Sequence, residues 1–235
     1  MTNERESTGL SEFLQYLAKE HNDGETLPSL KNLSKQLGVS IATLREQLEV
    51  ARALGLVEVR PKTGIRRQPY QFTPVVLKSL SYAAAIDQTF FFQAFSDLRN
   101  HVEAAYFNQA VELLTVEDHI YLRSLVDQAL CKLNGEQIQL PHDEHRLLHL
   151  SIYRHLNNPF VTGILEAYWA AYEALGFNVY TDISYLVNVW QYHRRMVEAI
   201  CAGDVGAAFY IFMDHTNLLL QRPSVPRVVS RQEFE

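Results

Sequence analysis

The stretch from Leu27 to Arg67 constrains the fold most, because it fits two short amphipathic helices and a hairpin into 41 residues. Ser29 is placed to cap a first helix and Gly38 to end it. Ser40 is placed to cap a second helix, which Gly55 ends. Each helix has apolar residues at helical spacing: Leu30, Leu33 and Leu37 in the first, and Leu44, Leu48 and Ala51 in the second. Such short helices are stable only when these apolar faces pack together.

A hairpin is predicted directly after the second helix. Apolar and polar residues alternate from Leu56 to Arg60, as in a strand. Pro61–Gly64 is then predicted to form a turn, and Ile65–Arg67 to run back alongside the first strand. Helix, tight turn, helix and hairpin together predict a winged helix-turn-helix, whose second helix enters the major groove of DNA. A small three-helix domain with a hairpin and no DNA-binding role is the alternative reading of the same spacing.

Charge favours the DNA-binding reading. Residues 31–67 carry eight basic and three acidic side chains, a local net charge of +5 in a chain whose total is −6. Phosphate binding depends on local cations, so an acidic total does not oppose it. The charge asymmetry predicts two domains, of which only the first contacts DNA.

The rest of the chain is predicted to be helical, so the fold class is mainly α: an N-terminal winged helix-turn-helix and a C-terminal all-α bundle. Two prolines between Gln68 and Pro74 mark the boundary. We therefore expect domains at residues 1–72 and 73–235. The second is expected to hold helices at 75–88, 90–114, 116–134, 142–157, 160–176, 183–202 and 204–221.

Four histidines occupy inward positions on three of these helices. They are His145 and His149, one turn apart on one helix, then His193 and His215 on the last two. A lone inward histidine is most often a core residue held by a hydrogen bond. Four of them predict a shared ligand, because burying several polar rings without partners costs a few kcal/mol each.

A divalent transition metal, zinc or nickel first, is the predicted ligand, since imidazole nitrogens suit these ions. Four nitrogens can close a tetrahedral site or leave positions open on an octahedral ion. The helix pattern predicts no inward Asp or Glu beside the four rings. A metal-dependent hydrolase, which needs a general base there, is therefore the weaker alternative.

Arg99 shares a helical stripe with Phe92, Phe95, Val102 and Tyr106, which are all apolar or aromatic. A guanidinium in such a place needs an anionic partner. Two readings stay open: an internal salt bridge, with Glu103 or an acid on a neighbouring helix, or a carboxylate or phosphate ligand held between Arg99 and the metal.

The motifs resemble the GntR family of bacterial transcription regulators, in its FadR subfamily. The winged-helix motifs are LPS at 27–29, LGVS at 37–40, LRE at 44–46 and GLVEVRPKTG at 55–64. In the second half, LRNHVEAA at 98–105, Asn158-Pro159 and HRRMVEAICAGD at 193–204 resemble the family's metal-binding ligand domain, called FCD.

The resemblance implies roles for individual residues. It places the metal ligands at His149, His193 and His215, with His145 where the family has an aspartate, which makes the site about one charge unit more positive. It places Arg99 in the effector cavity. The implied phosphate or base contacts in the DNA-binding half are Lys31, Ser40, Thr43, Arg45, Lys62, Thr63 and Gly64.

The implied function is a cytoplasmic homodimer that binds double-stranded operator DNA and responds to a small anionic metabolite, a carboxylate. A metal-free cavity for an acyl-type ligand, as in some relatives, is the alternative. The pattern indicates neither a membrane span nor an enzyme.

Overall fold

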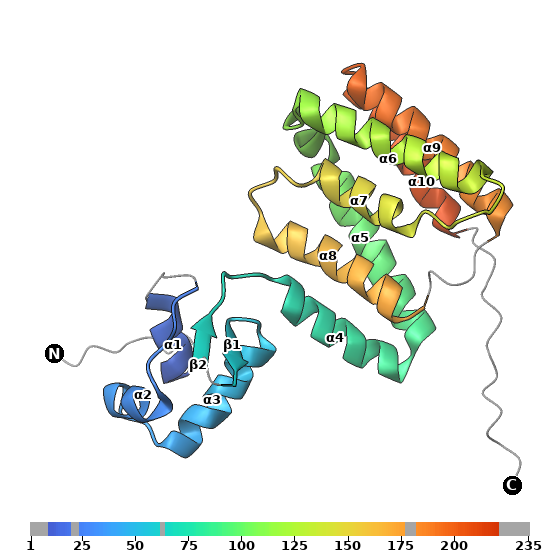
Figure 1. The fold of residues 1–235 in the computed structure, drawn as a ribbon. Helices are drawn as coiled ribbons and strands as arrows, with labels where there is room; N and C mark the ends of the chain where they lie inside the picture. The colour runs from blue at the N-terminus through green and yellow to red at the C-terminus, as the bar shows by residue number, and fades with distance from the viewer. Residues whose placement is uncertain (1–8, 20–23, 62–63, 177–181, 221–235) are drawn as a thin grey trace, which may run out of the picture.

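The computed structural model describes residues 9–19, 24–61, 64–176 and 182–220. Within these residues the chain forms ten helices and one two-stranded sheet. A small lobe of three helices and the sheet is joined by a short segment to a larger lobe of helices (Figure 1). The mainly helical fold predicted from the sequence is confirmed, and the sheet belongs to the small lobe.

The small lobe contains the predicted two-helix unit and hairpin. Its elements are α1 (Glu12–Lys19), α2 (Leu30–Leu37), α3 (Ile41–Ala53), β1 (Val57–Arg60) and β2 (Gly64–Arg67). The side chains of Ser29 and Ser40 accept backbone hydrogen bonds at the starts of α2 and α3, as predicted. Gly38 ends α2 in the left-handed conformation, with a φ of 72°.

An apolar core holds the small lobe together. Phe13 of α1, Leu33 of α2 and Leu44 of α3 are fully buried in it, and Val57 and Ile65 add the two strands. Each such side chain contributes about 1.5–3 kcal/mol when it is removed from water. The core therefore fixes how α3 lies against α1, α2 and the hairpin.

Arg67 is buried, although the charge pattern grouped it with the exposed cations of the hairpin. Its guanidinium donates a hydrogen bond to the Leu17 carbonyl and lies 6.0 Å from the centre of the Tyr16 ring. In β2 the core-facing residues are Ile65 and Arg67, two positions apart. Arg67 thus ties the hairpin to α1 and adds no charge to the outer surface.

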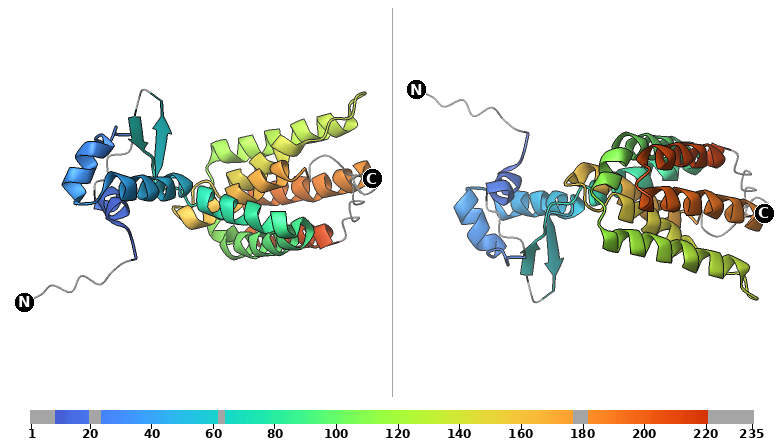
Figure 2. Two further views of the ribbon diagram at one scale, coloured as in Figure 1. Left: turned by 90° about the horizontal axis from the view of Figure 1, so that it is seen from below. Right: turned by 90° about the horizontal axis from the view of Figure 1, so that it is seen from above.

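The larger lobe is a bundle of seven helices within the described ranges. They are α4 (Thr73–Ile86), α5 (Gln88–Glu112), α6 (Val116–Asn134), α7 (His142–Ile152), α8 (Pro159–Ala174), α9 (Ile183–Cys201) and α10 (Val205–Leu220). Most of them run roughly along the line that joins the two lobes (Figure 2). In the described part of the chain, no helix combines the length and apolar character that a membrane span requires.

Two helix groups make up this bundle. α9 packs against α6 and α10, while α4 packs against α5 and α8, and α5 also contacts α10. The main core contains Phe107, Leu122, Leu148, Trp190 and Phe212. A smaller cluster, which includes Phe92, Tyr168 and Trp169, lies where α4, α5 and α8 meet.

The helix predicted at 142–157 is shorter in the structure, because α7 ends at Ile152. Pro159 disfavours helical backbone at Asn158, which is extended and caps α8 through its side chain. The intervening residues form turns, and Leu156 remains buried although it lies outside the helix. The apolar pattern was thus correct about burial but wrong about where the helix stops.

The segment that joins the lobes is seated on α8. A Cβ added to Gly163 would lie 2.7 Å from Phe72 Cβ and 2.9 Å from Thr73 N, so only glycine permits this approach. Thr73 Oγ1 also donates a 2.5 Å hydrogen bond to Glu166 Oε2. On the other side, a Cβ at Gly55 would lie 2.6 Å from Pro74 Cγ. The start of α4 is therefore held between the small lobe and α8.

Candidate functional site

In the small lobe, the first turn of α3 and the neighbouring start of α2 are exposed to solvent. Lys31, Ser40, Thr43 and Arg45 are all exposed. The hydroxyls of Ser40 and Thr43 lie 2.9 Å apart, so both belong to the cap of α3. A helix start with exposed N–H groups and hydroxyls favours contact with an anion such as a DNA phosphate.

Only part of the local positive charge remains available to DNA. Arg52 is paired with Glu49 at 2.8 Å, and Arg60 with Glu58 at 2.7 Å. Arg45 has no ion-pair partner among the described residues, which leaves its guanidinium free for phosphate or base contacts. Gly64 is exposed at the start of β2, whereas Lys62 and Thr63 lie outside the described residues.

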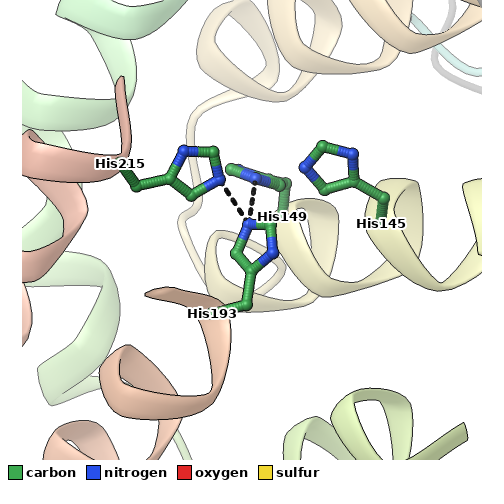
Figure 3. A group of neighbouring side chains, drawn as sticks. All are labelled: His145, His149, His193 and His215. Atoms are coloured by element: carbon green, nitrogen blue, oxygen red, sulfur yellow. Dashed lines mark hydrogen bonds between the residues drawn. The ribbon is translucent and has the colours of Figure 1, made fainter. Parts of the chain in front are cut away.

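In the larger lobe, the four predicted histidines converge. One nitrogen of each ring lies within 4.8 Å of the others. His149 and His193 approach to 3.3 Å through their Nε2 atoms, and His193 and His215 approach to 2.5 Å. His149, His193 and His215 are fully buried, while His145 is half-buried and faces the other three rings (Figure 3).

The donor set fits a divalent transition metal. A tetrahedral zinc ion with imidazole nitrogens at about 2.0–2.1 Å holds them about 3.3–3.4 Å apart. The separation of the His149 and His193 Nε2 atoms, 3.3 Å, matches that spacing. The Nε2 atom of His145 is buried without a hydrogen-bond partner among the described residues, so this nitrogen is available to coordinate a metal ion.

Burial keeps the four rings neutral. It places the pKa of His145 and of His193 well below the ordinary value and lowers that of His215 to about 3. Burial also lowers the pKa of His149, against the opposing attraction of a nearby carboxylate. Each neutral ring keeps a nitrogen lone pair near pH 7, which is what a metal ligand requires.

That carboxylate is Glu103, a residue the helix pattern did not place in the site. Its side chain is fully buried, and Oε1 accepts a 3.1 Å hydrogen bond from His149 Nδ1. Oε2 accepts a 2.7 Å hydrogen bond from Arg99 Nη1. Burial by itself raises the pKa of Glu103, but Arg99 and His149 outweigh it and hold the pKa below its ordinary value.

The expectation that no inward acid accompanies the histidines is therefore wrong. The buried face of α5 contains Phe92, Arg99, Glu103 and Phe107, whereas Val102 and Tyr106 are only half-buried. The true stripe is rotated by about one residue from the predicted one. The spacing of four between Arg99 and Glu103 is the signal that indicates it, because opposite charges at this spacing meet on one helix face.

Arg99 forms the internal salt bridge with Glu103 that was one of the two predictions for it. It also lies 4.3 Å from the centre of the Tyr168 ring and 5.5 Å from that of Trp169. Its Nε remains buried without a partner among the described residues. Arg99, His145 and His215 all line one cavity of about 20 Å³, so the arginine and the histidine cluster share this space.

Comparison with known protein families agrees with this arrangement. Residues 95–218 match the FCD domain model, and residues 17–66 match the model of the bacterial regulatory proteins of the gntR family. The chain belongs to the GntR family. The FCD match spans Arg99, Glu103 and the last of the four histidines, so the whole cluster lies inside that domain.

Two relatives of this GntR chain align with most of its length. The uncharacterized HTH-type transcriptional regulator YieP of Escherichia coli strain K12 is 25% identical over 201 residues, covering 82% of this chain and 84% of YieP. YcbG, an uncharacterized HTH-type transcriptional regulator of Bacillus subtilis strain 168, is 24% identical over 199 residues, covering 82% of this chain and 78% of YcbG.

A solved GntR structure from Streptococcus agalactiae has the same fold. It superimposes with a TM-score of 0.63 at 16% identity, covering 92% of this chain and 98% of that one. Together, the family and the relatives identify a transcriptional regulator with a DNA-binding small lobe and an FCD effector-binding domain, and not an enzyme. The hydrolase alternative is thereby excluded, although the first argument against it, the absence of an inward acid, was wrong.

Proposed function

We propose that this GntR regulator binds a divalent transition metal, zinc or nickel, on His145, His149, His193 and His215. A small anionic metabolite, a carboxylate, then binds beside the metal and Arg99 and changes the affinity for operator DNA. The convergence of four neutral imidazoles in the interior carries this proposal. A bound ion would act as a Lewis acid that attracts an anionic oxygen.

Charge supports an anionic effector. The four imidazoles are neutral, and the charges of Arg99 and Glu103 cancel each other in their 2.7 Å salt bridge. The charge of a divalent ion would then remain unbalanced in a low-dielectric interior, where it attracts anions strongly. The unpartnered Nε of Arg99 gives a carboxylate a second donor in the same cavity.

Cavity size supports a small acid over an acyl chain. The cavity of about 20 Å³ holds about one water-sized group. A carboxylate group requires only local shifts of the rings that line the cavity, such as Tyr172 and Trp169. An acyl chain would require the core to open further, and such a ligand leaves the four histidine nitrogens without a role.

The DNA-binding half of the proposal assigns operator contacts to Lys31, Ser40, Thr43, Arg45 and the hairpin tip at Lys62, Thr63 and Gly64. The exposure of the first four and of Gly64 supports it. We further propose domains at residues 1–72 and 73–235, supported by their separate apolar cores. A homodimer in the cytoplasm would place its two small lobes on the two half-sites of the operator DNA.

Native mass spectrometry of the purified protein tests these proposals together. We expect the mass of a dimer with about one divalent ion per chain, and a further mass shift when small carboxylic acids are added to the metal-loaded protein. A metal-free protein that stays metal-free after incubation with zinc or nickel would contradict the proposal.

A further inference from the structure

Glu103 connects the histidine cluster to Arg99 through a single side chain. One carboxylate oxygen accepts from His149 Nδ1 at 3.1 Å, and the other accepts from Arg99 Nη1 at 2.7 Å. The backbone carbonyl of Glu103 accepts a 3.0 Å hydrogen bond from the Tyr153 hydroxyl. The carboxylate is therefore held between two side chains with different tasks.

For His149, this contact determines which nitrogen carries the proton. An ionised carboxylate only accepts hydrogen bonds, so a neutral His149 must carry its proton on Nδ1. The lone pair is then on Nε2, the atom that lies 3.3 Å from His193 Nε2 inside the cluster. A ring turned over or in the other tautomer would present a hydrogen atom to the site and not a lone pair.

His149 differs from two of its neighbours in this respect. The Nδ1 atoms of His193 and His215 are buried and have no hydrogen-bond partner among the described residues. In metal sites, the outer nitrogen of a ligating histidine almost always donates to a carboxylate, a carbonyl or water. Within the described cluster, Glu103 is the carboxylate that provides this contact.

For Arg99, the same carboxylate fixes the position of the guanidinium. Arg99 lies one helical turn before Glu103 on α5, and its guanidinium is held over the Tyr168 ring at 4.3 Å. This arrangement leaves Nε without a partner at the cavity that His145 and His215 also line. The metal side and the anion side of the site are thus aligned by one group.

We propose that Glu103 is a positioning residue that orients both the metal ligand His149 and the effector-facing Arg99. The inference rests on the metal site proposed above. Removing the carboxylate would weaken metal binding although Glu103 itself is not one of the four converging ligands.

Asp118 offers a matched control elsewhere in the same bundle. It is also a buried carboxylate, and it accepts from His155 Nε2 at 2.7 Å and from Arg154 Nη1 at 3.0 Å. This trio has the same residue chemistry, a carboxylate between a histidine and an arginine, although Asp118 also caps α6 through Thr115. His155 is not part of the histidine cluster. Asp118→Asn therefore reproduces the loss of a buried carboxylate without touching the proposed metal site.

The test compares the dissociation constants for zinc, measured by competition with a chelating dye. Glu103→Gln is expected to weaken zinc binding by about 10–100-fold, the usual effect of losing such an outer partner. Asp118→Asn is expected to bind zinc as the wild type does. Equal affinities of Glu103→Gln and the wild type would overturn the inference alone. Failure of the wild type to bind zinc would overturn the metal site as well.

A second measurement needs no variant. Two-bond ¹H–¹⁵N correlation spectra of the metal-free wild-type protein report which ring nitrogen of His149 is protonated. We expect a single tautomer with the proton on Nδ1, and Glu103→Gln should mix the two tautomers while Asp118→Asn should not. A wild-type His149 protonated on Nε2 would overturn the inference.

Discussion

The two lobes differ in where they keep their polar groups. The small lobe has an apolar core that encloses the charge of Arg67, and Lys31, Arg45 and Arg66 stay on its surface. The larger lobe buries Arg99, Glu103 and three histidines in its interior. The first arrangement serves recognition of a large partner from outside, whereas the second serves recognition of something small enough to be enclosed.

The difference shows where the choice of interior residues can be explained by the stability of the fold and where it requires a functional reason. Burying an unpaired polar group costs about 2–7 kcal/mol, so a fold without a functional need would place apolar residues at these positions. In the small lobe the interior can be explained by apolar packing and by the hydrogen bond from Arg67 to the Leu17 carbonyl, which ties the hairpin to α1. In the larger lobe the buried polar groups require hydrogen bonds to one another or contacts with a ligand. Function in this lobe therefore depends on its interior.

The largest expected effect is the loss of metal from His149→Ala combined with His193→Ala. Removing two of four ligands should reduce the metal content from about one ion per chain to none, because the remaining nitrogens cannot hold the ion. Elemental analysis of the dialysed protein measures this. His101→Ala, which changes an exposed histidine on α5, is the control and should keep the metal. Full metal content in the double variant would refute the assignment.

Arg99→Ala should have the next largest effect. It leaves the buried Glu103 carboxylate unpaired, which costs about 3–5 kcal/mol of stability. It should also abolish the response of operator binding to small carboxylic acids. Thermal unfolding and a DNA-binding assay with a panel of such acids measure the two effects.

Arg154→Ala is the comparison for that prediction. Arg154 also pairs with a buried carboxylate, that of Asp118, but is itself half-exposed to solvent. Its loss should cost less than about 1 kcal/mol and leave the response intact. A retained acid response in Arg99→Ala would show that the salt bridge with Glu103 is the whole role of Arg99.

Arg45→Ala should weaken operator binding by about 1–3 kcal/mol, because it removes an unpaired cation from the exposed face of α3. The assay uses a DNA fragment selected from a random pool by the wild-type protein. Arg52→Ala on the same helix, where Glu49 already neutralises the charge, should have a smaller effect. An equal effect of both changes would mean that α3 does not approach DNA with its Arg45 side.

The smallest expected effect tests how the lobes are joined. Gly163→Ala places a methyl group 2.7 Å from Phe72 and should shift the start of α4, changing operator affinity by about 0.5–2 kcal/mol. Gly206→Ala on α10 is the control, because a Cβ there meets only ordinary contacts. Unchanged operator affinity in Gly163→Ala would show that the contact of Phe72 and Thr73 with α8 does not orient the small lobe.

Much of this architecture could be predicted from the sequence. Caps at Ser29 and Ser40 and the glycine at Gly38 mark the helix ends of the small lobe, because backbone geometry there admits few residue types. The four histidines could be predicted because helical spacing places each of them on an apolar stripe. Their convergence, however, depends on how three helices cross, which spacing within one helix does not contain.

Two errors have a physical reason. On α5 the predicted stripe with Phe95, Val102 and Tyr106 is more apolar than the true one, which contains Glu103. Hydrophobicity alone therefore could not reveal that Glu103 faces inward. In β2, the alternation that buries Ile65 also buries Arg67, and the positive charge was read as a sign of exposure. In both cases a charged residue finds a partner in the interior: Arg99 and His149 for Glu103, and the Leu17 carbonyl for Arg67. A hydrophobic pattern does not record such pairings.

X-ray absorption spectroscopy at the metal edge tests the central claim most directly. The account predicts that the zinc-loaded wild-type protein shows nitrogen scatterers at about 2.0–2.1 Å with the outer-shell signature of several imidazole rings. A first shell made only of oxygen atoms, or no bound metal at all, would contradict the claim that these four histidines form one site.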